Sequence, residues 1–477
     1  MTTRQDEQTA PAEDSAPVDP TTLRPLATSA ATPAIEIAAA AASARAFMDE
    51  PRWRDSRFRA DVLRAWAGAL RTQADPLISD IVTETGKPIA EARIEITAAA
   101  DSLDHNAGLA RYLGGRAGTL GDGAEAHLVR EPLGVCLFVV PWNWPVLLLL
   151  RDLAPALAAG VTALVKPSPQ TTLITRRILD IGVTAGVPAD AARLVVGGAA
   201  AGERALRHPD VAGVAFTGST PVGTRIMQIA AERFVRPLLE LGGKGIAVIF
   251  DDVPDLESTV AELTRAAVIT SGQMCMACTR ILVQRGTYDR VLTATRDALA
   301  ARRIGDPRDP GTEIGPLISA DHRDRVERLL ADARADGATV SGGERVVPDG
   351  TSGPFLTPAV VTGVAPTSLI VQEDVFGPVV TVEPFDDEAH ALDLANCTRY
   401  GLVAAVYTAD VDRTWRTARR LRAGTVWING YNKSYPELPS GGVKASGLGR
   451  TRGIEGLEQF TELKNVHFTV GAGRAGG

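Results

Sequence analysis

The sequence predicts a mixed α/β protein with two domains. Short β-branched runs alternate with helical segments over most of the chain, a pattern typical of a mostly parallel sheet with helices on both faces. The chain has 477 residues, which is too long for one compact core. Because the runs fall into two sets along the chain, we expect two α/β domains with a binding site between them.

The predicted elements follow one another without an internal repeat or a long linker. Residues 1–30 and 471–477 are small-residue or polar segments without a hydrophobic period, so both predict disordered or flexible tails. Helical patterning dominates from about residue 35 to 113. The first set of strands is Val135–Val140, Val161–Val165, Leu194–Val196, Val211–Phe216 and Ile246–Phe250, and a helix between them is expected around Thr172–Ala185. The second set is Ile281–Gln284, Val379–Val382, Val403–Tyr407 and Thr425–Ile428.

Composition and charge argue against several classes of protein. The chain is 45% hydrophobic and 22% charged, which is ordinary for a globular protein. Its formal net charge is -7 and no basic block appears, so neither nucleic acid nor a membrane is an expected partner. The 4 cysteines are too few for a disulfide framework, and the first residues lack an apolar secretory stretch. We therefore expect a soluble, cytoplasmic protein.

The apolar run at 132–150 needs a separate test as a membrane span. A Pro-Trp-Asn-Trp-Pro turn at 141–145 interrupts it, and Arg151 ends it. A lipid-exposed helix would tolerate this break poorly. The run therefore predicts a buried strand, a turn and a buried helix from about Val146.

Cys275 is the first of several candidate catalytic residues. It follows Gly-Gln in a predicted loop after a helix, where a cysteine can act as a nucleophile; by itself, a buried structural thiol is the more frequent interpretation. Cys275 and Cys278 also form a C-x-x-C pair. A zinc site would need a second ligand pair, and a redox motif would need a small thioredoxin-like context. A regulatory disulfide between the two is a further hypothesis.

Two other segments suggest a base and an oxyanion donor. Glu240 opens Glu-Leu-Gly-Gly-Lys, and a desolvated glutamate there can be a base of raised pKa. A surface helix end with a glycine cap is its structural alternative. Asn143 lies between two prolines and two tryptophans, a rigid setting that suits an oxyanion donor. Its alternative is a turn-forming residue.

The segment 216–223, Phe-Thr-Gly-Ser-Thr-Pro-Val-Gly, follows a predicted strand and opens a helix. Free N–H groups at a helix start, with a serine hydroxyl, suit a pyrophosphate. Thr224 and Arg225 stand where a Walker A loop needs Lys-Ser/Thr, and a G-x-G-x-x-G motif is absent.

Together these segments resemble the aldehyde dehydrogenase superfamily, in its hydrolytic, non-acylating, NAD(P)-dependent branch. The resemblance runs from about residue 35 to 470. Its motifs, in the family's order, are PWNWP at 141–145, KPS at 166–168, FTGST at 216–220, ELGGK at 240–244, GQMC at 272–275, EDVFGP at 373–378, TVWIN at 425–429 and PSGGVKASG at 439–447. The resemblance implies an enzyme that oxidises an aldehyde to a carboxylic acid with NAD or NADP.

Matching residues carry implied roles. Cys275 would attack the aldehyde to form a thiohemiacetal and then a thioester, with its thiol pKa lowered by the electropositive site and the nearby cofactor. The amide of Asn143 and the N–H of Cys275 would hold the oxyanion. Glu240, which CoA-acylating relatives lack, would activate the hydrolytic water. The implied cofactor residues are Trp142, Lys166, Ser168, Pro169, Gly218, Ser219, Gly223, Leu241, Gly242, Asp374 and Phe376. No metal site is expected.

The resemblance also implies an aldehyde dehydrogenase-like architecture of two Rossmann-like α/β domains and a protruding β arm. A dinucleotide-binding domain would span 31–113 and 133–242, and a catalytic domain 243–439. Residues 114–132 and 440–470 would contribute the oligomerisation arm, with its last strand near Leu457–Phe468. Exposed edge strands pair across subunits, so a homodimer or homotetramer is expected.

The sequence departs from the family pattern at several positions. Pro169 replaces the glutamate that takes the adenosine ribose in NAD enzymes, which admits NADP. Asp374 replaces a longer glutamate at the nicotinamide ribose. Asp152 and Thr451 stand where some members have a Lys and Glu proton relay, so that relay is not expected here.

Arg151, Ser434 and Trp144 are the candidate substrate residues. The first two match positions that bind a carboxylate in semialdehyde dehydrogenases, although a second arginine of that site is Ile269 here. An acidic semialdehyde is therefore slightly favoured over an aromatic aldehyde of the benzaldehyde or vanillin type. A cationic substrate such as betaine aldehyde is disfavoured, because Arg151 would repel it.

Three alternatives stay open at this point. An ion pair between Arg151 and Asp152 would make Arg151 structural rather than substrate-binding. A CoA-acylating enzyme is opposed by Glu240. A non-catalytic scaffold is opposed by the presence of nucleophile, base and oxyanion amide together.

Overall fold

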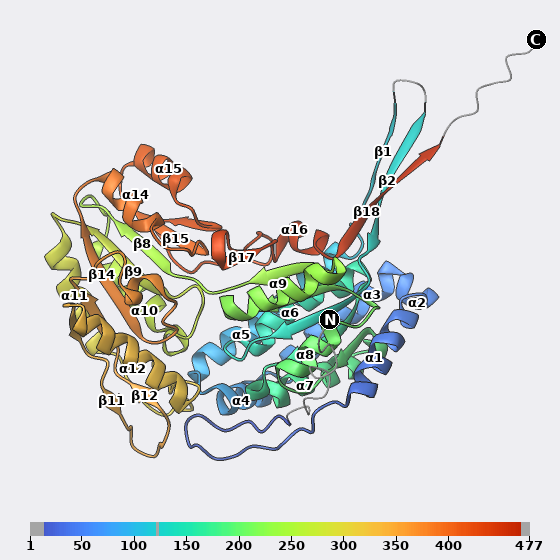
Figure 1. The fold of residues 1–477 in the computed structure, drawn as a ribbon, viewed down its shortest axis with the longest axis horizontal. Coiled ribbons are helices and arrows are strands. Elements are labelled where there is room, and N and C mark those ends of the chain that lie inside the picture. The colour runs from blue at the N-terminus through green and yellow to red at the C-terminus, as the bar shows by residue number, and fades with distance from the viewer. Residues whose placement is uncertain (1–13, 121–123, 469–477) are drawn as a thin grey trace, which may run out of the picture.

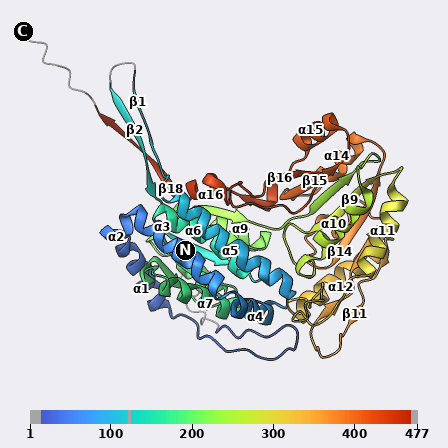
Figure 2. The same ribbon diagram turned by 180° about the vertical axis from the view of Figure 1, so that it is seen from behind.

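The computed structural model describes residues 14–120 and 124–468. Figure 1 and Figure 2 show two α/β lobes side by side, with a narrow sheet projecting from one of them. The predicted α/β class is confirmed. The predicted tails at 1–13 and 471–477 lie outside the described residues, and the predicted domain boundaries stay a prediction.

The first lobe is built on a six-stranded sheet with the order β17-β7-β6-β3-β4-β5, in which only β17 is antiparallel to its neighbour. Its strands are β3 (Val135–Val140), β4 (Thr162–Pro167), β5 (Ala192–Leu194), β6 (Val211–Thr217), β7 (Arg236–Glu240) and β17 (Gly447–Leu448). Its helices are α1 (Ala34–Phe47), α2 (Pro51–Arg54), α3 (Ser56–Thr72), α4 (Ala74–Thr85), α5 (Ile89–Leu109), α6 (Pro145–Ala159), α7 (Thr172–Thr184), α8 (Ala199–Leu206) and α9 (Thr220–Arg233).

The second lobe is built on a seven-stranded sheet with the order β10-β13-β14-β9-β8-β15-β16, parallel except at β10. Its strands are β8 (Gly245–Ile249), β9 (Cys278–Gln284), β10 (Thr339–Ser341), β13 (Ala359–Thr362), β14 (Val379–Phe385), β15 (Val403–Tyr407) and β16 (Thr425–Ile428), beside a small pair of β11 (Arg345–Val346) and β12 (Phe355–Leu356). Its helices are α10 (Leu256–Val268), α11 (Tyr288–Ala300), α12 (Ala320–Ala335), α13 (Leu369–Gln372), α14 (Glu388–Asn396) and α15 (Val411–Arg420).

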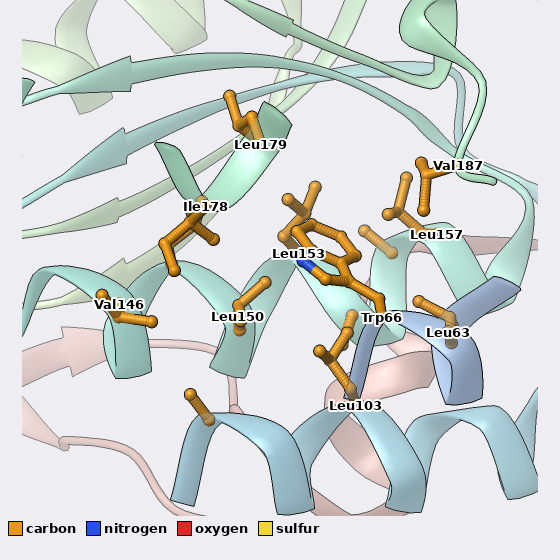
Figure 3. Close-up of a cluster of buried hydrophobic side chains, with 14 of the residues drawn as sticks. Leu63, Trp66, Leu103, Val146, Leu150, Leu153, Leu157, Ile178, Leu179 and Val187 are labelled. Atoms are coloured by element: carbon orange, nitrogen blue, oxygen red, sulfur yellow. The ribbon is translucent and has the colours of Figure 1, made fainter. Parts of the chain in front are cut away.

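The core of the first lobe surrounds Trp66 of α3. Figure 3 shows this indole among leucine and isoleucine side chains of α3, α5, α6 and α7, and only 1% of Trp66 is exposed. A Cβ added at Gly182 of α7 would lie 2.8 Å from the indole, so a glycine is needed there. Burying a side chain of this size stabilises the fold by about 1.5–3 kcal/mol or more. This packing anchors α6, which begins directly after the turn that holds Asn143.

The predicted strands agree with the structure where the sequence is locally β-branched. Val135–Val140 is confirmed residue for residue, and the buried helix predicted from about Val146 is α6. The predicted strand at Leu194–Val196 is shifted, because β5 ends at Leu194. The strand β7 was missed, since Arg-Pro-Leu-Leu-Glu contains a proline and no β-branched residue.

The prediction of a disordered tail is wrong for residues 14–30. The Oγ of Ser15 donates to the carbonyl of Pro169 at 2.6 Å in the first lobe. Asp19 accepts from Arg308 at 2.7 Å in the second lobe. This segment therefore lies across both lobes. Composition could not predict this, because the contacts that order the segment come from residues far away in sequence.

The projecting sheet has three antiparallel strands in the order β1-β2-β18: Arg116–Thr119, Glu125–Pro132 and Thr461–Phe468. The last strand begins later than predicted, because Leu457 belongs to the short helix α16 (Gly453–Glu458). Among the described residues, no helix combines the length and the hydropathy that a membrane span requires.

Candidate active site

A cavity of about 390 Å³ lies where the two lobes meet. The first lobe contributes the turns at the carboxyl ends of β3, β6 and β7, the edge at which open parallel sheets bind ligands. The second lobe contributes the loop at 270–275, which ends at the predicted nucleophile Cys275 (the nucleophile loop), and the segment before β14. Ten predicted site residues line it: Trp142, Asn143, Gly218, Ser219, Glu240, Leu241, Gly242, Cys275, Asp374 and Phe376.

The loop before Cys275 has an unusual backbone. Thr270 and Ser271 have φ values of 49° and 56°, followed by Gly272 at 75°. Non-glycine residues in this left-handed region cost on the order of 1–3 kcal/mol each, so other contacts must hold them. The Glu91 carboxylate of α5 accepts from both N and Oγ1 of Thr270 at 2.8 Å, and the Ser271 hydroxyl donates to the carbonyl of Gly315 at 2.8 Å.

Gln273 fixes the next part of this loop. Its Nε2 donates to the carbonyl of Thr270 at 3.0 Å, and its Oε1 accepts from the N–H of Ile318 at 2.9 Å. Its carbonyl accepts from Nδ2 of Asn143 at 3.0 Å. A side-chain amide has two N–H donors, so one donor of Asn143 holds the loop and the other can face a substrate oxygen.

Cys275 is half-buried on the floor of the cavity. Burial raises the pKa of its thiol to about 12. The charge of Arg151 and a hydrogen bond from the residue's own backbone N–H act in the opposite direction. The electropositive site by itself therefore does not lower the pKa of this thiol, and lowering by the site and the cofactor together stays a prediction. Desolvation of the thiolate outweighs the positive charge nearby.

Glu240 is the last residue of β7 and is buried. The alternative of a surface helix end is wrong. Burial raises the pKa of Glu240 to about 8, against the lowering effect of Arg151. Its Oε1 has no hydrogen-bond partner among the described residues. A carboxyl group with a pKa in this range exchanges its proton near neutral pH, and its carboxylate form can then act as a general base.

The start of α9 provides a phosphate-binding geometry. Ser219 is its N-cap residue, and no side chain caps the first N–H groups of this 14-residue helix. Gly218 and Ser219 both line the cavity. Unpaired N–H groups at a helix start attract anions, so this end of the cavity suits the pyrophosphate of a dinucleotide.

Phe376 and Trp142 form the apolar wall of the cavity. Their rings meet edge to face, with centroids 5.6 Å apart. Phe376 has a φ of 56°, and His322 and Arg325 of α12 hold its segment: His322 Nε2 lies 2.6 Å from the carbonyl of Phe376, and Arg325 donates to the carbonyl of Asp374 at 2.8 Å. Sequence reasoning missed His322 and Arg325, because no local motif marks them.

Asp374 lines the cavity and uses one carboxylate oxygen to hold the backbone. Its Oδ2 accepts from the N–H of Gly243 at 3.2 Å, and burial raises its pKa to about 6, against the charge of Lys244.

Four predicted cofactor residues do not line the cavity. Lys166, Ser168 and Pro169 lie at and after the carboxyl end of β4, next to β3. Lys166 is buried, donates to the carbonyl of Pro167 at 3.1 Å, and has its pKa lowered to about 8 by desolvation. Gly223 packs under the site, where an added Cβ would lie 2.5 Å from Leu241.

None of the three candidate substrate residues lines the cavity. Arg151 forms a bidentate ion pair with Asp152, the structural alternative considered above. Trp144 is buried under the ammonium of Lys87, which lies 3.9 Å from its ring. Ser434 lies on an exposed loop.

Two alternatives for the cysteines of the described residues are a metal site and a disulfide, and the regulatory disulfide stays a hypothesis. No group of three or more His, Cys, Asp or Glu side chains there is arranged to hold a metal ion. The cysteines of the described chain, Cys275 and Cys278 included, are free thiols.

The sequence pattern of the aldehyde dehydrogenase family matches residues 7–466. The chain belongs to this family. Betaine aldehyde dehydrogenase 1 of Rhizobium meliloti is 39% identical over 93% of this chain and 91% of the relative. As an aldehyde dehydrogenase, the chain is an enzyme that oxidises aldehydes.

Solved aldehyde dehydrogenase structures share the whole fold. An NAD-dependent aldehyde dehydrogenase from Sinorhizobium meliloti superimposes with a TM-score of 0.93 at 34% identity, over 96% of this chain and 92% of that one. An NADP-dependent enzyme from E. coli has a TM-score of 0.92 at 34% identity, over 96% and 95% of the two chains.

Proposed function

We propose that the enzyme oxidises its aldehyde by covalent catalysis at Cys275, with Asn143 as oxyanion donor and Glu240 as base. One observation carries this proposal: the three side chains come from both lobes and line one cavity. We further propose that 31–113 and 133–242 form the dinucleotide-binding domain, and 243–439 the catalytic domain.

The first step is attack of the Cys275 sulfur on the aldehyde carbon. The thiol must first lose its proton, and Glu240 lines the same cavity as a base of raised pKa. The carbonyl oxygen becomes an oxyanion that accepts from the free N–H of Asn143 and from the N–H of Cys275. Fixed donors of this kind act where water is excluded.

The cofactor site would be built by the start of α9, the ring of Phe376 and the carboxylate of Asp374, with Lys166, Ser168 and Pro169 toward the adenosine end. When bound, NAD⁺ or NADP⁺ supplies the hydride acceptor that turns the thiohemiacetal into a thioester. Pro169 carries no carboxylate to repel a 2′-phosphate, so we propose that both dinucleotides are accepted.

Hydrolysis completes the reaction. Glu240 first releases the thiol proton to solvent and then takes a proton from water, the resulting hydroxide attacks the thioester carbon, and the Cys275 thiolate leaves as the carboxylic acid forms. The thiolate is then ready for the next aldehyde or takes up a proton. This route needs no CoA, so added CoA should leave the rate unchanged.

The contacts of Arg151 bear on which class of aldehyde the enzyme accepts. Its Nε and Nη2 donate to Asp152, so the buried pair as a whole carries no net charge toward a substrate, although each member still acts on the groups next to it. An acidic semialdehyde therefore loses its proposed anchor, and a cationic aldehyde loses the repulsion that disfavoured it. We propose a neutral, aromatic or cationic aldehyde; a betaine aldehyde dehydrogenase among the relatives supports including the cationic class.

The test is a matrix of initial rates. NAD and NADP are each combined with betaine aldehyde, benzaldehyde, a medium-chain alkanal and succinic semialdehyde, and reduced cofactor is recorded. Cys275→Ser should abolish the signal, whereas Cys397→Ser, at an exposed cysteine outside the cavity, should retain it. A clear preference for succinic semialdehyde would contradict the substrate proposal, and an active Cys275→Ser would contradict the mechanism.

The projecting sheet supports a homo-oligomer. β18 is an edge strand of this sheet, and its Leu463 and Phe468 are 54% and 52% exposed, so a strand of another copy could pair beside it. We propose that this sheet pairs with another copy of the chain in the cytoplasm. Leu463→Lys should shift the mass seen by light scattering toward the monomer, and an unchanged mass would contradict the arm's role.

A further inference from the structure

The side chain of Arg151 is buried between α6 and the end of β6, with only 6% of it exposed. Its Nε donates to Oδ1 of Asp152 at 3.0 Å, and its Nη2 donates to Oδ2 at 2.7 Å. Nη2 also donates to Oγ1 of Thr217 at 2.7 Å. The first contacts are local to α6, whereas the contact with Thr217 ties α6 to the sheet.

Thr217 connects this ion pair with Glu240. The two residues are register partners at the carboxyl ends of β6 and β7. The N–H of Gly218 also donates to the carbonyl of Glu240 at 3.0 Å. Adjacent strands lie about 4.8 Å apart, so the guanidinium that contacts Thr217 lies close to the proposed base.

The charged and titratable groups that act on Glu240 come from α6, from the segment after β17 and from the nucleophile loop: Arg151, Asp152, Arg450, Arg452 and Cys275. Burial raises the pKa of Glu240, and Arg151 opposes this more strongly than any other group. Asp152 acts in the opposite direction to Arg151.

We propose that Arg151 is a positioning residue that favours the carboxylate form of Glu240, the form needed for hydrolysis, and that Asp152 moderates this effect. The inference rests on the proposed function, in which Glu240 is the base. It assigns Arg151 to the deacylation step instead of to the substrate. It also gives Asp152, which stands where some family members have a lysine, a role without a proton relay.

The proposal predicts opposite effects for the two members of one ion pair. Arg151→Met leaves the charge of Asp152 unopposed, so protonated Glu240 is favoured. Asp152→Asn leaves the charge of Arg151 unopposed, so the carboxylate is favoured. A purely structural ion pair would give losses of the same sign, because breaking it from either side leaves a buried charge.

The experiment follows the acyl group on Cys275 by rapid-quench mass spectrometry after a pulse of aldehyde and NAD⁺, from pH 6 to 9. Arg151→Met should move the acid limb of the deacylation rate to higher pH and slow decay at pH 7 by about tenfold for each pKa unit. Asp152→Asn should move the limb to lower pH, and Arg151→Lys should restore most of the wild-type profile. Arg207→Met, in an exposed ion pair with Glu232, is the matched control.

The outcomes separate the two proposals. Shifts of the same sign in both variants, or no shift in either, would overturn the role of Arg151 while acylated Cys275 still forms. Absence of an acyl group on wild-type Cys275 would instead overturn the proposed function. If Arg151→Met does not fold, the other two variants still test the proposal. The acid limb of Asp152→Asn must then lie at lower pH than that of Arg151→Lys.

Discussion

Asn143 donates its side-chain amide to the carbonyl of Gln273 at 3.0 Å, which joins the proposed oxyanion donor of the first lobe to the nucleophile loop of the second. The loop in turn is held by Glu91 of α5, through two contacts to Thr270. Contacts from the first lobe therefore help to position the loop that carries Cys275, together with Gly315 and Ile318 of the second lobe.

Asn143→Ala should lower the rate of acylation about 10²- to 10³-fold, because one fixed donor to the oxyanion is lost. Stopped-flow recording of reduced-cofactor formation measures this step. Asn465→Ala, on the exposed face of the projecting sheet, should leave the rate unchanged. An Asn143→Ala enzyme that acylates at the wild-type rate would contradict the assignment.

Glu91→Ala should lower both stability and turnover. It leaves the buried N–H of Thr270 without its acceptor, which typically costs about 1–3 kcal/mol of stability. It also removes a contact that holds Thr270 and Ser271 in the left-handed region of φ, which is unfavourable for these residues. Urea denaturation and kcat measure the two effects. Glu36→Ala, at an exposed position of α1, should change neither by a comparable amount. Full activity in Glu91→Ala would show that the loop keeps its conformation without this carboxylate.

The stability of the fold should fall as the pH rises from about 4.5 to about 8. Burial raises the pKa of Glu84 to about 8 and that of Glu91 to about 7, so the folded state holds protons that the unfolded chain has released. The corresponding stability is fully present below pH 4.5 and is lost as the pH passes through 7 and 8.

Thermal unfolding midpoints across this range measure the effect, and Glu84→Gln should flatten the slope. The amide oxygen can still accept from the N–H of Ile174, where the carboxylate now accepts at 2.7 Å. A slope equal to that of the wild type would mean that Glu84 does not titrate there.

Gly182→Ala and Gly68→Ala should have opposite effects on stability. At Gly182 the new Cβ would lie 2.8 Å from the Trp66 ring, so the core of Figure 3 must shift at a cost of about 1–3 kcal/mol. At Gly68, also in a helix, a Cβ meets nothing within 4 Å, and alanine should stabilise by about 0.4–1 kcal/mol. Chemical denaturation of both variants tests the pair. Two changes of the same sign would contradict this packing.

The amino-acid sequence by itself determined the α/β class, most of the strands and the family. β-branched runs such as Val135–Val140 form strands wherever they are buried, and a proline at the start of α6 is compatible with the first turn of a helix. The motifs around Asn143, Glu240 and Cys275 are recognisable because each needs particular residues within a few positions. Each of these features depends on residues that are close together in the chain, so it can be predicted from the sequence.

Only the tertiary structure decided what the buried charges do. Arg151 is bound by Asp152 and by Thr217, 66 positions away, and no spacing in the chain predicts the second contact. The pKa of Cys275 is raised because burial in the folded chain desolvates its thiol. The segment at 14–30 is ordered by partners on both lobes. Burial and hydrogen bonding between distant residues are properties of the packed chain, which is why the chemistry of the site could be named from the sequence but its electrostatics could not.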